Sequence, residues 1–176
     1  MAADLTKVKL GPCKVTFDPE GTTPIVIELT QGGVVLTYEE TTRDVNSDQH
    51  GTTAIKKIIT GRNASVQVPM LEKDNSRLKD FIAGSVLVTN ATEPTKKRLD
   101  VFADKVIDLL TVAKELRIEP LTEGATADDT VTIFKAAPQV NLNQTYSYNN
   151  ELVTNVTFSG FPDATGRLLG FGDPDA

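Results

Sequence analysis

The sequence predicts a mainly β domain: an antiparallel β-sandwich or partly closed barrel with one flanking α-helix and a long protruding hairpin. Valine, isoleucine and threonine recur along the chain and tryptophan is absent, a composition that favours strands. Short runs of these residues are separated by glycine, proline and aspartate turns, and only one segment has clear helical spacing. A chain of 176 residues can bury a substantial core as one domain. We therefore expect a single domain over 1–176, with an N-terminal arm over 1–12 and a C-terminal arm over 163–176.

The first two strands are predicted from short β-branched runs. The run "CKVTFDP" (13–19) alternates and then stops at Asp-Pro, a turn signal. The run "PIVIEL" (24–29) is similar in composition and equally short. Both are too short for helices and are flanked by turn residues, so each predicts a strand.

A long hairpin is predicted next. The extended runs 32–44 ("GGVVLTYEETTRD") and 55–71 ("IKKIITGRNASVQVPML") flank the polar stretch "DVNSDQHGTTA". Two extended runs around a polar loop indicate antiparallel arms with a hydrophilic tip, and we place the hairpin loop at 42–55. Gly61 marks a candidate bulge in the second arm.

The one predicted helix follows the hairpin. Asp74 or Asn75 can cap its start and Gly84 can end it. Apolar residues at helical spacing form one stripe along it, consisting of Leu71, Leu78, Phe81 and Ile82.

The remainder of the chain predicts further strands. Strands are expected at 86–90, 97–103, 130–140 and 151–161, with a loop at 122–129. The stretch between 104 and 121 fits a short helical turn followed by a strand that ends at Pro120. The residues after 161 show no period, so no regular element is predicted there.

The sequence gives little sign of catalysis or of a bound cofactor. It has one histidine, His50, and one cysteine, Cys13, which are too few nitrogen and sulfur ligands for a metal cage. No nucleophile motif lies beside His50. The "GFGD" near the end lacks the third glycine and the helix of a dinucleotide loop, and the Gly-Lys-Ser/Thr of a phosphate loop. We expect no enzyme activity, cofactor or metal, although two carboxylates that meet only in the fold stay open as a hydrolase site.

The net charge of −6 is unevenly distributed. Residues 1–100 carry 13 basic and 13 acidic side chains, whereas residues 101–176 carry 5 and 11. This excess of acids argues against tight nucleic-acid binding, which depends on lysine and arginine at phosphates. The start of the chain lacks the apolar core of a secretory signal, and no apolar run approaches about 20 residues. We expect synthesis in a cytoplasm and no membrane contact.

Three stretches, taken in order, carry a family resemblance. They are "DQHGTTAIKKIITGRNASVQVPMLE" with the helix directly after it, "LLTVAKELRIEPL", and the closing "VTFSGFPDATGRLLGFGD". Together they span most of the chain. In this order and spacing, the sequence resembles the tail tube proteins of long-tailed bacteriophages or of related prophage and tail-like particles.

The resemblance implies a structural virion protein without enzyme activity. Tail tube proteins form hexameric rings that stack into a tube, and strands of neighbouring subunits join into a barrel around an acidic lumen. DNA passes through this lumen during ejection without specific binding. The implied partners are further copies of the chain, the tape measure protein, and the tail terminator and distal tail proteins. The implied location is the virion tail, assembled in the cytoplasm of the host bacterium.

The resemblance also implies candidate contact residues. We expect the hairpin loop to reach an adjacent ring, although an uncovered surface loop would have the same sequence. The terminal arm would dock on a neighbouring subunit rather than on its own domain, and two acids are candidates for the lumen or for the outer surface. The candidates are Asp44, Asn46, Asp48, His50 and Thr52 in the hairpin, Leu168, Leu169 and Phe171 in the arm, and Asp128 and Asp129 for the lumen.

A second class of function fits the same strands. A non-enzymatic β-sandwich binding module, such as a virion decoration or receptor-binding domain, would share the strand content and the lack of catalytic motifs. Such a module would not need a long hairpin and would not polymerise into tubes.

Overall fold

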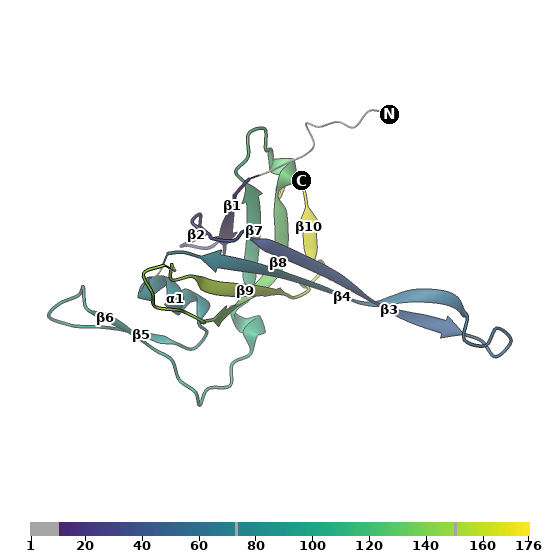
Figure 1. Cartoon of the computed structure of the whole chain (residues 1–176), viewed down its shortest axis with the longest axis horizontal. Coiled ribbons are helices and arrows are strands. Elements are labelled where there is room, and N and C mark those ends of the chain that lie inside the picture. Colours follow the sequence, from purple (N-terminus) through teal and green to yellow (C-terminus); the bar gives the residue numbers. More distant parts are fainter. Residues whose placement is uncertain (1–10, 73, 150) are drawn as a thin grey trace.

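The computed structural model describes residues 11–72, 74–149 and 151–176. Most of the predicted N-terminal arm, residues 1–10, therefore lies outside the described residues. The described chain forms an eight-stranded antiparallel sheet, a separate two-stranded sheet and one α-helix (Figure 1). This confirms the predicted fold class, with a sandwich-like arrangement rather than a closed barrel.

The main sheet has the strand order β2-β1-β7-β8-β9-β4-β3, with β10 also paired to β8. In Figure 1, β1, β7, β8 and β10 stand upright, whereas β3, β4 and β9 lie across them. The sheet therefore turns at β8, and its two halves enclose the core between them. The strands are β1 (Cys13–Phe17), β2 (Ile25–Ile27), β3 (Val35–Asn46), β4 (Ala54–Met70), β7 (Lys114–Pro120), β8 (Val131–Asn141), β9 (Thr154–Gly160) and β10 (Leu169–Phe171).

The core is built from the alternating residues of the long strands. In the second half of β4, Ala64, Val66, Val68 and Met70 are buried, whereas the residues between them are exposed or half-buried. Alternation of this kind places every second side chain on the core face. An aromatic cluster fills the centre: the Phe158 ring lies 5.3 Å from Phe17 and 5.9 Å from Phe81, measured between ring centroids.

The predicted hairpin is formed by β3 and β4, but its loop is shorter than the predicted 42–55, because residues 42–46 and 54–55 belong to the paired strands. The two strands pair from Val35↔Gln67 to Asn46↔Ala54. Their register shifts where Thr41 pairs with Gly61 and Thr42 with Ile59, so Thr60 is the extra residue. The predicted bulge at Gly61 is thus present.

Helix α1 (Asn75–Phe81) begins at the predicted cap but is shorter than the sequence suggested. The Asp74 carboxylate accepts a hydrogen bond of 3.2 Å from the Ser76 N–H, which identifies Asp74 as the N-cap. Ile82 is already the C-cap, and Leu71 lies before the helix, so neither extends the predicted stripe. Gly84 follows with a φ of +72°, a conformation that favours glycine.

The small sheet pairs β5 (Val86–Thr89) with β6 (Lys97–Asp100). It lies beside α1, where the Asn75 side-chain amide donates to the Lys97 carbonyl at 3.4 Å. The strand predicted over 97–103 was too long, because residues 101–103 leave the sheet.

In the rest of the chain, the structure agrees with the predicted turn and strand before Pro120 and differs from the prediction at two other segments. A 3₁₀ turn at Leu109–Val112 leads into β7, as predicted. The stretch 122–129, predicted as a loop, contains a 3₁₀ turn at Ala127–Asp129. The terminal residues were predicted to lack regular structure, but β10 pairs Leu169 with Ile133 of β8.

Candidate functional site

The hairpin extends well beyond the body of the domain (Figure 1). Strand β9 pairs with β4 only at residues 65–70, so residues 54–64 of β4 have β3 as their one strand neighbour among the described residues. Every residue from 51 to 60 is exposed, including Ile55, Ile58 and Ile59 at 53%, 37% and 48%. A two-stranded hairpin alone has only marginal stability in water. The three exposed isoleucines form an apolar surface that the rest of the described chain leaves uncovered.

The outer part of the hairpin has two chemically different faces. Arg43 pairs with Ile58 and Val45 with Lys56, and directly paired residues point to the same side. These four residues, which carry two cations and no carboxylate, are called the basic hairpin face. On the opposite side, the Lys57 ammonium lies 3.4 Å from the Asp44 carboxylate.

The five hairpin residues singled out in the sequence lie together at this end of the molecule. Asp44 and Asn46 are in the last residues of β3, and Asp48, His50 and Thr52 are in the tip. The tip is an ordered turn, because the His50 N–H donates to the Ser47 carbonyl at 3.0 Å. All five are exposed. The three isoleucines were missed, because an apolar residue in a strand is normally assigned to the core.

The sheet of β3, β4, β9 and β8 has a second face, directed away from the core, which is rich in uncharged polar groups. Its cross-strand rows follow from the register, for example Thr37–Ser65–Ser159 and Gln67–Thr157–Gln139. Hydroxyl and amide groups dominate, and Glu39 is the one charged residue of the set. We call this the polar sheet face; its polar side chains are Thr37, Glu39, Asn63, Ser65, Gln67, Gln139, Asn141, Asn155, Thr157 and Ser159.

This part of the sheet has an open edge at each end. Strand β3 is outermost and pairs only with β4 in the described chain. At the other end, residues 137–141 of β8 pair with β9 on one side and with no described strand on the other. Pro138 lies in this stretch, and proline within sheets is confined to such edges because it lacks an N–H. Open edges present unpaired backbone groups to any strand that can approach.

The acids considered for a lumen lie elsewhere. Asp128 and Asp129 belong to the 3₁₀ turn before β8, whereas the polar sheet face uses the other end of that strand. The Asp129 carboxylate accepts a hydrogen bond of 2.9 Å from the Thr126 N–H, so it acts as a cap. The structure does not bring these two acids onto the polar sheet face.

The terminal arm packs mainly on its own domain. Leu168 and Leu169 lie against the hydrophobic core, while Phe171 is 73% exposed. Asp163 holds the turn before β10, since its carboxylate accepts from the Thr165 hydroxyl at 2.7 Å and from Arg167 Nε at 2.8 Å. These bonds, the Thr165 hydroxyl first, hold the pKa of Asp163 well below its usual range. Two of the three arm residues expected at a neighbour thus contact their own sheet.

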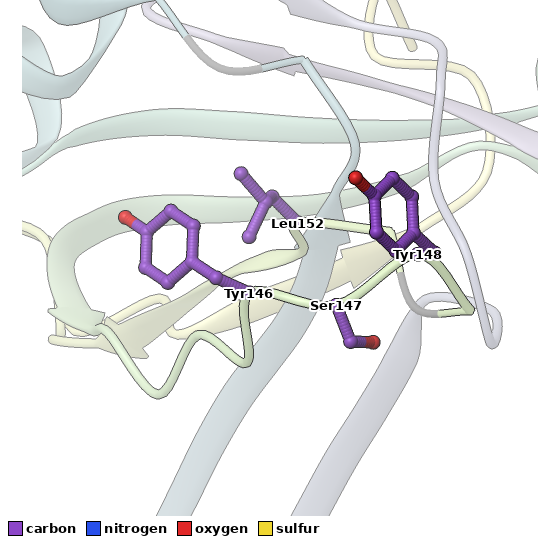
Figure 2. A pocket seen from close by; sticks show the side chains of 4 residues that line it. All are labelled: Tyr146, Ser147, Tyr148 and Leu152. Carbon is purple, nitrogen blue, oxygen red and sulfur yellow. The ribbon is translucent and has the colours of Figure 1, made fainter.

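A shallow hollow of about 370 Å³ lies on the loop between β8 and β9 (Figure 2). Tyr146, Ser147, Tyr148 and Leu152 line it, and the two tyrosine rings lie on opposite sides of Leu152. Tyr148 is fully exposed. The lining contains no carboxylate, histidine or lysine that could act as a general acid or base near neutral pH.

The described residues also contain no cluster of three or more histidine, cysteine, aspartate or glutamate side chains placed to hold a metal ion. No helix in this part of the chain has the length and apolar character needed to cross a membrane.

Comparison with known proteins gives no family assignment. No family model and no curated protein matches the sequence. Among solved structures, the chain is similar to a chain of the anti-feeding prophage baseplate, a cryo-EM structure symmetrised six-fold. The two share 13% identity with a TM-score of 0.46, over 93% of this chain and 95% of the other.

Proposed function

We propose that this chain is a structural subunit of a phage tail or tail-like particle, which polymerises as stacked hexameric rings into the tail tube. The observation that carries the proposal is the arrangement of β8, β9, β4 and β3. This sheet has an open edge at each end, a polar outer face and a hairpin that continues far beyond it.

The two open edges support ring formation. The edge of β3 lies at one end of the sheet and residues 137–141 of β8 at the other. When β3 of one subunit pairs with β8 of the next, the contact is heterologous, and such contacts close into rings when the rotation permits. Closure removes the exposed edges, which otherwise invite uncontrolled aggregation.

The protruding hairpin supports stacking. When a neighbouring ring covers its exposed isoleucines, each Å² of buried apolar surface stabilises the contact by about 25 cal/mol. The same contact orders a hairpin that lacks a core of its own, and ordering its backbone without such a contact costs about 1–2 kcal/mol per residue. The hairpin is therefore assigned to the contact between rings.

The polar sheet face is suited to the wall of a DNA conduit. Its ten listed polar side chains include no lysine or arginine, so this part of the sheet offers no cation for tight phosphate binding. Within a hexamer, Glu39 would contribute one carboxylate per subunit to a ring that repels the backbone of DNA. In this proposal the tape measure protein fills the lumen during assembly, and the terminator and distal tail proteins contact the two ends. The subunit itself performs no catalysis.

A binding module is the alternative, favoured by the hollow at Tyr146 and Tyr148. Exposed tyrosines with small polar neighbours are typical of recognition loops, because a tyrosine ring gives large contact area at low entropy cost. A receptor-binding or decoration module would use this loop and remain a discrete particle.

Sedimentation velocity over a concentration series separates the two functions. A tube subunit should shift from monomer to rings or larger polymers as concentration rises. A protein that stays strictly monomeric at high concentration would rule out the tube and leave the binding module.

A further inference from the structure

An exposed segment between β6 and the 3₁₀ turn at Leu109–Val112 combines apolar and acidic side chains. Val101, Phe102 and Val106 are 63%, 46% and 103% exposed. Asp104 lies between Phe102 and Val106 in the sequence, Asp108 follows Val106, and both are also exposed. We call residues 101–108 the acidic loop.

The acidic loop has a defined conformation. Ile107 lies so close to Gly84 that a Cβ added there would collide with Ile107 Cδ1. The Asp108 carboxylate accepts from the Leu110 N–H at 2.9 Å, and the Lys105 ammonium lies 4.5 Å from the centre of the Phe102 ring. These contacts hold Ile107, the backbone at Asp108 and the Phe102 ring in place, so this part of the loop is preorganised for contact.

The basic hairpin face is complementary to this loop in both charge and polarity. The hairpin face carries the two cations Arg43 and Lys56 beside apolar side chains. The loop carries two carboxylates, Asp104 and Asp108, and one cation, Lys105, which lies over the Phe102 ring. Among the described residues, none of the side chains of Arg43, Lys56 and Asp104 has an ion-pair partner. Complementary charges around an apolar contact favour one register and exclude like-charged partners.

The two surfaces cannot meet within one molecule. In Figure 1 the hairpin extends from the right of the body, whereas the acidic loop, which follows β6, hangs below it. We propose that the basic hairpin face docks on the acidic loop of a second copy of the chain. This rests on the proposed function and deepens it, because it names the surface that receives the hairpin of the adjacent ring.

Cysteine cross-linking tests the contact directly. In a Cys13→Ser background, Lys56→Cys and Asp104→Cys are prepared as separate proteins, mixed as monomers and treated with a short bismaleimide under assembly conditions. The expected product is a Lys56→Cys/Asp104→Cys heterodimer on a denaturing gel. Lys57→Cys is the matched control, since it is the next residue along but faces the other side, and it should give at least about tenfold less product.

Charge reversal gives a second measurement that does not depend on labelling. Lys56→Glu and Asp104→Lys should each raise the concentration needed for assembly by about tenfold, and the double variant should restore it. Lys57→Glu should leave that concentration nearly unchanged.

The outcomes separate this inference from the proposed function. Tubes without the Lys56–Asp104 product, or without rescue in the double variant, would overturn the inference and leave the tube intact. Cross-linked chains that never form tubes would support the contact and contradict the tube. Absence of both tubes and cross-links would overturn both.

Discussion

The guanidinium of Arg167 lies over the ring of Phe134, with 4.1 Å between its central carbon and the ring centroid. Arg167 thereby joins the turn before β10 to the middle of β8, while its Nε donates to Asp163. The contact explains why the end of the chain folds back on its own sheet rather than extending freely.

Replacing Arg167 with alanine should therefore destabilise the domain. The variant loses an exposed cation–π contact and an exposed ion pair, so its free energy of unfolding should fall by about 1 kcal/mol. Urea unfolding followed by circular dichroism measures the change. Lys79→Ala serves as the control, because Lys79 is an exposed cation on α1 without a described ion pair. Equal stabilities of the two variants would show that Arg167 does not anchor the arm.

The Asp163 carboxylate should make the free energy of unfolding depend on pH in the acidic range. Its pKa is lowered in the fold, chiefly by the Thr165 hydroxyl and then by the Arg167 bonds, so the ionised form favours the native state. This contribution is complete above the unfolded pKa of about 4 and is lost as the pH falls toward the folded pKa. The stability difference between the native protein and Asp163→Asn should therefore narrow on acidification. A difference that stays constant down to about pH 2 would contradict the assignment.

Replacing Gly84 with alanine should destabilise the domain. Its φ of +72° already disfavours other residues, and a Cβ would collide with Ile107. Gly84→Ala should cost about 1–3 kcal/mol of stability in thermal unfolding. Gly166→Ala is the matched control, since Gly166 has a φ of +86° but nothing within 4 Å of the added Cβ. The excess cost at Gly84 measures the packing that fixes the acidic loop, and an equal cost at both sites would contradict that packing.

Deletion of residues 46–53 should separate folding from assembly. The core strands lie outside this segment, so the variant should keep the circular dichroism and unfolding transition of a folded domain. It should lose higher-order assembly, because the tip and its flanking strands no longer reach a neighbouring ring. Sedimentation velocity reports this loss. Polymers of normal size formed by the deletion variant would remove the hairpin from the stacking contact.

The sequence predicted those elements that are determined by residues close together in the chain. Asp74 caps α1 because a carboxylate two residues before Ser76 can accept its N–H, and this pattern is visible in the sequence. The long hairpin was likewise evident from two extended runs around a polar loop. Strand β10 was missed because it has three residues, one of them Gly170, and exists only through its pairing with β8.

The exposed isoleucines required tertiary information. Alternation in β4 shows which residues share a face, but not where the strand leaves the core. That point is set by β9, which ends its pairing with β4 at Ser65. Beyond it, Ile55, Ile58 and Ile59 have no layer to cover them, so residues typical of a core become a surface.

The central claim is that this chain closes into six-fold rings whose inner wall is the polar sheet face. Cryo-EM of polymers formed by the purified protein tests it most directly. We predict hollow tubes with six subunits per ring, β3 paired with β8 of the next subunit, and Glu39 and Thr157 facing the lumen. Rings in which the polar sheet face points outward, or particles without six-fold symmetry, would contradict the account.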